Sequence, residues 1–274
     1  AGSTLVAAYL YSATYSTGAT PTVTLGGTGV TFGPAVPNAT ACCRLASWRS
    51  DVTSIVKPTI DGGAGGVYNF AVTEGEPNID GEALVVVYEN AALPEATVGI
   101  LDGFASVAGD TAAINFTDPL DPSDPGFFAE MSLGIGFSCC GQKSSGAVNG
   151  TTITLNAGNN DDGSQQANGS LITVGGFDDP LSPFMPSYDE DHERYDLSGQ
   201  VALGDTTITV TTANPSRDDN IFLAAFYVSG IAGINEPPPD PDPDPDPSPL
   251  TEPGTLGLLG AGVLLMAIRR RRMQ

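Results

Sequence analysis

The sequence has few basic residues, and this shortage excludes one large class of partners. It contains 32 Asp and Glu residues against 10 Lys and Arg, which gives a formal net charge of −22. Four of the ten bases form the run 269–272 near the C-terminus. A surface of this charge repels phosphate groups, so we expect no binding to nucleic acid. The acidity is typical of a soluble protein outside the cell, and it also makes divalent cations candidate ligands.

Histidine and tryptophan occur once each, which limits the chemistry available to an active site. His192 lies in the acidic stretch 188–195, and no Gly-x-Ser-x-Gly motif accompanies it, so a Ser-His-Asp triad is disfavoured. We expect a solvated acidic loop or edge strand around His192. The sequence does not exclude a pair of carboxylates for glycoside hydrolysis, because any two of its many acids can meet in a fold. Trp48 is the single tryptophan, whereas sugar-cleaving clefts commonly use several aromatic side chains, so we expect no enzymatic activity.

The four cysteines lack the C-x-x-C spacing of zinc and redox sites. They form two adjacent pairs, Cys42-Cys43 and Cys139-Cys140, and one histidine cannot complete a Cys/His zinc set. In an exported protein we expect two disulfides that link one pair to the other. Reduced, buried thiols are the alternative.

Long helices are also disfavoured, because the chain is rich in Gly (34) and Pro (22) and divides into short apolar or alternating segments. Residues 83–88 and 221–228 are apolar throughout and predict central strands buried on both faces. Residues 49–56 predict a short helical turn capped by Ser50 or Asp51. Further strands are expected at 5–11, 22–25, 30–32, 67–72, 97–101, 112–116, 131–137, 151–155, 171–174 and 206–210. We predict an all-β fold, a β-sandwich of jelly-roll type, for residues 1–235.

A Pro-Asp repeat follows this domain at residues 236–250 and predicts a disordered, extended stalk. Proline forbids a helix there, and the like charges of the aspartates repel one another. In a polyproline conformation, residues 236–249 would span about 43 Å. The stalk would hold the domain away from whatever the following segment is fixed to.

The last segment, residues 251–274, has three parts. Glu252-Pro253-Gly254 is followed by an apolar run that ends at Ile268, for which we expect one short helix, and then by the four arginines Arg269, Arg270, Arg271 and Arg272. The run is short for a bilayer span, but the arginines would fix its end on the cytoplasmic side.

In this order of parts the segment resembles the PEP-CTERM sorting signal of Gram-negative bacteria, with Thr251 where that family has its first proline. The resemblance implies an exosortase-type processing enzyme as a partner, a transient anchor in the inner membrane, and cleavage near the motif. It further implies delivery to the cell surface or to an extracellular polysaccharide matrix. The chain begins without a leader sequence, so we expect a processed or truncated N-terminus.

Two segments gather the oxygen ligands that calcium prefers. Asp118, Asp121 and Asp124 lie in the first, and Asp161 and Asp162 lie in the second. Neither segment has the EF-hand spacing, and aspartate is also common in ordinary turns, which is the alternative interpretation. Calcium is therefore the one cofactor that the sequence suggests.

Four Asn-x-Ser/Thr sequons, at Asn38, Asn115, Asn149 and Asn168, are expected to stay largely unmodified in a bacterium.

Two hypotheses for function remain. The first is a non-catalytic protein of the cell surface or extracellular matrix, adhesive or structural, that associates with exopolysaccharide and is sorted by a cleavable tail. The second is a secreted carbohydrate-binding module or glycoside hydrolase delivered by the same signal. A cleft with two carboxylates and aromatic walls would favour the second hypothesis.

Overall fold

The computed structural model describes residues 2–15, 17–38, 44–136, 144–157, 173–174, 194–215, 217 and 220–233. In this part the protein is mostly antiparallel β-strand, so the prediction of an all-β fold is confirmed. None of its helices is long and apolar enough to cross a membrane. Several predicted features lie outside the described residues: the four cysteines, His192, Asp161, Asp162, the stalk and the C-terminal tail.

The strands and the helix between Ser3 and Asn90 form two sheets and one helix layer. Sheet A comprises β1 (Ser3–Thr14), β4 (Val36–Pro37), β5 (Ala46–Asp51) and β7 (Ile79–Asn90), in the order β4-β5-β1-β7. Sheet B comprises β2 (Val23–Leu25), β3 (Thr28–Gly29) and β6 (Val72–Glu74), in the order β3-β2-β6. The helix α1 (Thr53–Asp61) follows β5.

The strands between Thr97 and Val228 form two further sheets. Sheet C comprises β8 (Thr97–Asp102), β10 (Ala129–Ile135), β13 (Thr173–Val174), β14 (Arg194–Asp196) and β16 (Ile221–Val228). Its order is β13-β10-β16-β8, and β14 also pairs with β10. Sheet D comprises β9 (Asp110–Asn115), β11 (Ser144–Val148), β12 (Thr151–Ala157) and β15 (Thr207–Ala213), in the order β12-β11-β15-β9. A short 3-10 turn, η1 (Ser198–Gln200), follows β14.

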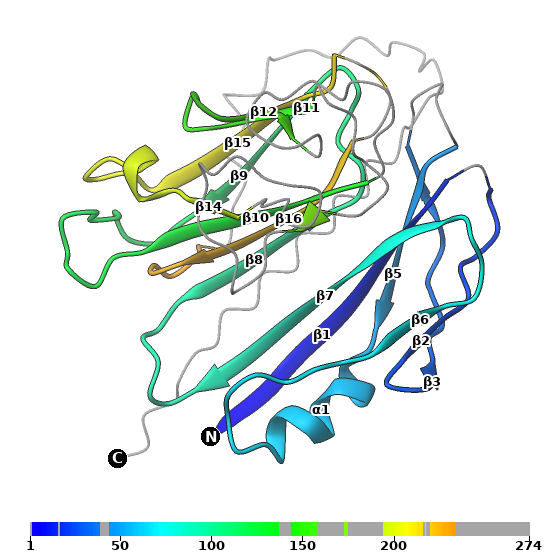
Figure 1. Cartoon of the computed structure of the whole chain (residues 1–274). Helices are drawn as coiled ribbons and strands as arrows, with labels where there is room; N and C mark the ends of the chain where they lie inside the picture. Colours follow the sequence, from blue (N-terminus) through cyan, green and yellow to red (C-terminus); the bar gives the residue numbers. More distant parts are fainter. Residues whose placement is uncertain are drawn as a thin grey trace, which may run out of the picture.

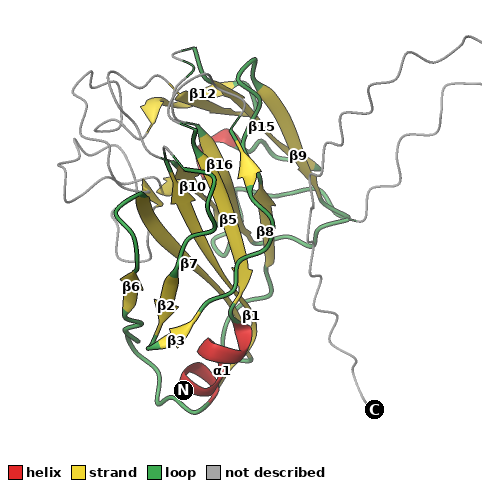
Figure 2. Cartoon of the chain, turned by 90° about the vertical axis from the view of Figure 1, so that its right-hand side faces the viewer, coloured by secondary structure: helices red, strands yellow, loops and turns green. Residues whose placement is uncertain are grey.

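The four sheets lie one above another, with sheet D at the top of Figure 1, then sheets C and A, and sheet B with α1 at the bottom. Figure 2 shows the same order from the side. Three clusters of buried side chains fill the spaces between these layers. One joins sheets D and C, one joins sheets C and A, and one joins sheet A to sheet B and α1. Sheets A and C are therefore covered on both faces, which explains their high apolar content.

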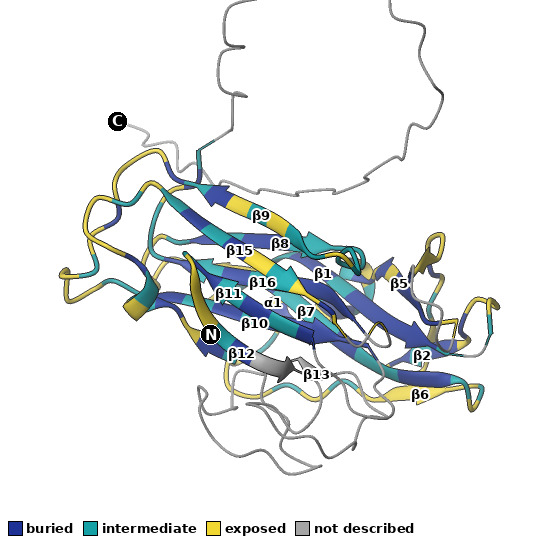
Figure 3. Ribbon diagram, turned by 90° about the horizontal axis from the view of Figure 1, so that it is seen from above, coloured by how far each residue is buried: buried dark blue, intermediate teal, exposed yellow. Residues whose placement is uncertain are grey.

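Strand β1 packs against two clusters because its side chains alternate between the faces of sheet A. Ala8 and Leu10 point toward sheet B and α1, whereas Ala7 and Tyr11 point toward sheet C. The register with β7 shifts between Leu5 and Ala7, so Leu5 joins the cluster with Ala8 despite its odd position. Along most of its length β1 is buried, as Figure 3 shows by its dark colour.

Helix α1 takes the place of β5 along the first half of β1, which β5 does not reach. The Leu5 N–H donates to Asp61 (2.7 Å), and Lys57 donates to the Leu5 carbonyl (3.0 Å). The Ala8 N–H donates to the Thr53 hydroxyl at 3.0 Å. The helix thus satisfies strand backbone groups that would otherwise lack partners inside the fold.

The helix begins later than the sequence predicted, because β5 continues through Asp51. Asp51, one of the two predicted capping residues, accepts a hydrogen bond from the Thr53 N–H at 2.9 Å. The other, Ser50, donates to the Thr31 carbonyl instead, at 2.7 Å. The predicted helical turn is correct in kind, but its first residues belong to a strand.

Three strand predictions need correction. Residues 83–88 lie in β7, which has packed side chains on both faces but is the last strand in the order of sheet A rather than a central one. The strand predicted at 67–72 begins only at Val72, because its partner β2 offers three residues for pairing. β2 pairs with β3 through a turn at Gly26-Gly27, both at positive φ, so β3 takes the place of the strand predicted at 30–32.

Candidate functional site

The loop between β9 and β10 carries three of the predicted calcium ligands. Asp121 accepts hydrogen bonds from the Ser123 N–H (2.9 Å) and hydroxyl (2.5 Å), which hold the pKa of this carboxyl below its ordinary value. Asp124 accepts a bond from the Gly126 N–H at 2.7 Å. Among the described residues, no three Asp, Glu, His or Cys side chains group into a possible metal site, and Asp118 joins no such group. Asp121 and Asp124 thus each accept hydrogen bonds within their own turn, which is the arrangement of the alternative interpretation.

The sequon asparagines of the described chain are also engaged in structure. Asn38 accepts a hydrogen bond from the buried Asn220 side chain at 3.3 Å. Asn115 accepts one from the Thr207 hydroxyl at 2.7 Å. The Asn149 side chain bonds backbone groups of two neighbouring segments, each at 2.9 Å. These amides already serve as hydrogen-bonding groups of the fold.

One group of aromatic and charged side chains has the composition of a binding surface. Its members in sheet C lie on the face that is turned away from sheet D, and its member in sheet A, near the end of β7, affects the pKa of Tyr227. We call it the patch, and it consists of five residues: Tyr88, Phe128, Glu130, Arg194 and Tyr227. They come from β7, the residue before β10, β10, β14 and β16.

The aromatic part of the patch is a stacked pair. The rings of Phe128 and Tyr227 lie 4.5 Å apart between centroids, with 28° between their planes. Burial raises the pKa of the Tyr227 hydroxyl above its ordinary value, and the nearby Tyr88 and Glu130 raise it further. Tyr227 therefore remains a neutral hydroxyl that can donate and accept hydrogen bonds.

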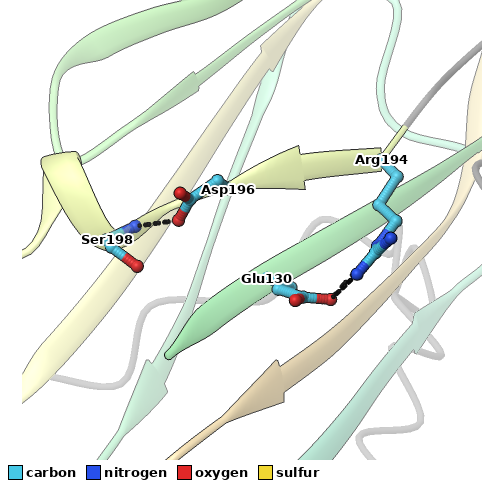
Figure 4. A network of polar contacts seen from close by, with 4 residues as sticks. All are labelled: Glu130, Arg194, Asp196 and Ser198. Atoms are coloured by element: carbon cyan, nitrogen blue, oxygen red, sulfur yellow. Dashed lines mark hydrogen bonds and ion pairs between the residues drawn. The ribbon is translucent and has the colours of Figure 1, made fainter. Parts of the chain in front are cut away.

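The charged part of the patch is one ion pair across two strands. The Arg194 guanidinium donates to Glu130 Oε2 from Nε (3.1 Å) and Nη2 (2.7 Å). Figure 4 shows Arg194 reaching over β10 to Glu130, while Asp196 turns the other way and accepts a bond from the Ser198 N–H at 2.8 Å. The two side chains of the ion pair are 17% and 28% exposed, so water reaches both.

A second polar group joins sheets A and C. The Tyr11 hydroxyl donates to Asp102 at 3.2 Å, and Asp102 also forms an ion pair with Arg49. The Arg49 guanidinium lies 5.5 Å from the centroid of the Tyr9 ring. Burial raises the pKa of Tyr11, and the charge of Asp102 raises it further, so this hydroxyl stays protonated. The group connects β1, β5 and β8 across the space between two layers.

A third polar group joins sheets A and B through two glutamates. Glu82 on β7 accepts a hydrogen bond from the Ser12 hydroxyl (3.1 Å), and its carboxyl is hydrogen-bonded to that of Glu74 on β6. Two carboxyls can share such a bond only if one carries a proton. Burial raises the pKa of Glu82 to about 7, and Glu74 and then Asp80 add to the shift.

This pair does not have the geometry of a glycosidase. Retaining enzymes hold their carboxyls about 5 Å apart and inverting enzymes hold them farther apart, whereas these two are in hydrogen-bond contact. The nearby Trp48 is 4% exposed and donates from its indole to Thr14 at 3.0 Å, so it offers no open aromatic wall. The pair is a shared-proton contact between two layers, and its carboxyls are closer together than those of a glycosidase.

The shared proton makes stability depend on pH. Because the folded pKa of Glu82 lies above that of the unfolded chain, this contribution is complete below about pH 4.5 and is lost as the pH rises through about 7. We expect the melting temperature to fall by about 2–4 °C between pH 5.5 and pH 8, which corresponds to about 1 kcal/mol after allowance for solvent screening. Circular dichroism melts of the intact chain measure this.

The Glu82→Gln variant should lose this part of the pH dependence, because its amide keeps a neutral donor toward Glu74. Glu95→Gln is the matched control, since Glu95 is exposed and should leave the wild-type profile unchanged. Equal pH profiles for the wild type and Glu82→Gln would contradict the shared proton.

Comparison of the chain with protein-family models, with curated proteins and with solved structures finds no match. The residues themselves therefore carry the functional argument. They define a class of protein by fold and surface: an all-antiparallel-β protein of stacked sheets, with an aromatic and charged patch on one of them.

Sequence reasoning did not find the patch. Its members are separated by long stretches of chain, and strand pairing brings them together, as where Glu130 lies opposite both Asp196 and Tyr227. One signal was present: the carboxyl of Glu130 and the hydroxyl of Tyr227 lie in largely apolar strands, at positions facing away from the core cluster. Polar groups at such positions mark a face that is not fully covered.

Proposed function

We propose that this chain is an exported, non-catalytic protein of the cell surface or extracellular matrix, with a structural or adhesive role in association with exopolysaccharide. One observation carries the proposal. The polar groups of the described chain that resemble catalytic machinery, the Glu74–Glu82 pair and the Arg49–Asp102–Tyr11 group, join one sheet to the next. Side chains that join neighbouring sheets stabilise the stacking of the layers, and this favours a structural role over a catalytic one.

We further infer that sheets C and D form a β-sandwich of jelly-roll type. Two features support this: eight strands in two four-stranded orders, β13-β10-β16-β8 and β12-β11-β15-β9, and one core cluster between them. Successive strands from β8 to β11 alternate between the two sheets, as a double Greek key requires. Sheets A and B then form an additional unit stacked on the outer face of sheet C.

Export is the second part of the proposal, and it depends on the tail. We propose that Glu252-Pro253-Gly254, the apolar run and Arg269–Arg272 form a PEP-CTERM-like signal that an exosortase-type enzyme cleaves after transient insertion in the inner membrane. The stalk would then separate the domain from that membrane while processing takes place.

Replacement of all four arginines, Arg269–Arg272, by alanine should prevent correct sorting, because the positive charges fix the cytoplasmic end of the apolar run. We expect the variant to be lost from the surface and matrix fractions, as measured by immunoblotting of fractionated cells. The same arginines replaced by lysine are the matched control and should restore delivery. Unchanged delivery of the alanine variant would contradict the sorting signal.

The alternative, a secreted carbohydrate-binding module, is favoured by one specific observation, the stacked Phe128–Tyr227 pair beside an ion pair. It differs from the main proposal in making sugar recognition the purpose of the domain. A glycoside hydrolase is less well supported, because the hydrogen-bonded Glu74–Glu82 pair lacks the required separation.

A further inference from the structure

The patch combines three aromatic side chains at the seam between sheets A and C. Tyr88, at the end of β7, is 43% exposed, and it lies close enough to Tyr227 to influence its titration. Tyr227 in turn stacks on Phe128 at 4.5 Å. Aromatic rings that are partly open to water bind the apolar faces of flat molecules, and they lose little rotamer entropy when they do so.

The stacked pair is held on a rigid backbone. Ser229, two residues after Tyr227, accepts a bond from the Phe128 N–H through its hydroxyl (2.9 Å) and donates from that hydroxyl to the Phe128 carbonyl (3.1 Å). The Ser229 N–H also donates to the same carbonyl at 2.9 Å. These bonds fix Phe128 beside β16, so the ring geometry exists before any ligand arrives.

The charges of the patch indicate which ligand it suits. Glu130 and Arg194 neutralise each other, so the patch offers acceptors and donors to hydroxyl groups without a net charge of its own. The chain as a whole carries a formal charge of −22, which repels polyanions over a long range. A neutral ligand with flat apolar faces and many hydroxyls fits this combination better than an acidic one.

We propose that the patch of Tyr88, Phe128, Glu130, Arg194 and Tyr227 is a binding site for an uncharged polysaccharide. Pyranose rings stack on the aromatic side chains, and the ion pair and the Tyr227 hydroxyl bond the sugar hydroxyls. This inference deepens the proposed function and rests on it, since it names the surface and the chemical class of polysaccharide that the exported domain would hold.

The test uses the intact chain in detergent and three insoluble probes: microcrystalline cellulose and cross-linked dextran, which are neutral, and calcium alginate gel, which is anionic. We expect retention on at least one neutral probe and none on alginate. Tyr88→Ala should weaken that retention about three- to tenfold, the range that one aromatic contact supplies. Tyr88→Phe should retain binding, because it keeps the ring.

Two controls separate binding from folding. Leu203→Ala removes another exposed apolar side chain, 73% exposed and away from the patch, and should bind as the wild type does. Tyr88→Ala should melt within about 1 °C of the wild type, because Tyr88 is 43% exposed and is not part of a core cluster. Absence of retention on both neutral probes, or equal retention of the wild type and Tyr88→Ala, would overturn the proposed site.

Failure of this inference is distinguishable from failure of the proposed function. If Tyr88→Ala accumulates in the extracellular matrix as the wild type does and binds the neutral probes equally well, the patch is not the site, but the exported role stands. If the wild type is absent from the matrix fraction, the proposed function itself is wrong, whatever the probes retain.

Discussion

Phe222→Ala should lower the free energy of unfolding by about 3–5 kcal/mol, the range for removing a large aromatic side chain from a core. Phe222 is 1% exposed and lies between sheets A and C. Its ring is 6.1 Å from that of Tyr11 and 6.0 Å from that of Phe104. It also packs over Gly134, where an added Cβ would come within 3.2 Å of the ring, and this glycine has no side chain to fill the space that the variant leaves.

Urea denaturation followed by tryptophan fluorescence measures this effect, because the single tryptophan, Trp48, lies in the next cluster, between sheets A and B. If the layers unfold together, the Trp48 transition shifts as far as the far-ultraviolet circular dichroism transition. Leu203→Ala serves as the surface control and should change stability by less than about 0.5 kcal/mol. A loss of under about 1 kcal/mol for Phe222→Ala would contradict the packing of sheet A on sheet C.

Asn220→Ala should cost about 2–3 kcal/mol, because it removes a buried amide that joins three segments. The Asn220 side chain is 1% exposed. It donates to the Ala105 carbonyl (2.5 Å) and to Asn38 (3.3 Å), and it accepts from the Ile221 N–H (3.0 Å). The substitution removes the acceptor of the buried Ile221 N–H and the donor to the Ala105 carbonyl, and a buried polar group that loses its bond costs more than the bond itself contributes.

The matched control for that variant is Asn90→Ala. The Asn90 side chain donates to the Ser3 hydroxyl (3.0 Å) and accepts from the Ala92 N–H (2.9 Å), but at the open end of β7. Water can replace these bonds, so we expect a loss below about 1 kcal/mol. Equal losses for the two variants in urea denaturation would show that burial of Asn220 is not the source of its effect.

Local sequence pattern predicted individual strands well where burial is continuous. The segment 221–228 was predicted as a central strand, and β16 has the same bounds, because both of its faces are packed between sheets. The same pattern placed 83–88 in the centre of a sheet, whereas β7 stands at the end of sheet A. The apolar content of a strand indicates how many of its faces are covered by other layers. It does not indicate whether the strand has one or two neighbours within its own sheet.

The stack of four sheets could not be predicted from the sequence, because long-range pairing determines it. Ser3 lies opposite Asn90, and Thr97 lies opposite Val228. Nothing near these residues in the chain specifies such partners. Bulges add to the difficulty: the register of β10 with β16 shifts between Gly134 and Ile135, so Phe222 and Leu223 both face sheet A.

Among the described residues, closeness in sequence does not gather the predicted calcium ligands of the loop between β9 and β10 into one group. Asp118, Asp121 and Asp124 are close in sequence, and the bonds of Asp121 and Asp124 run to their own turns, since the nearest donor to a short acidic side chain is the backbone two residues ahead. The patch, in contrast, consists of residues that are far apart in sequence, from 88 to 227. None of them lies in a local motif that would mark it as part of a site.

The central claim is that this chain is an exported protein held in an extracellular polysaccharide. The measurement that tests it most directly is the distribution of the native protein between the cell, matrix and medium fractions of producing cells, compared with cells that make no polysaccharide. We predict that the protein is recovered in the matrix fraction of the first and is released into the medium by the second. Retention inside the cell, or the same distribution in both, would contradict the account.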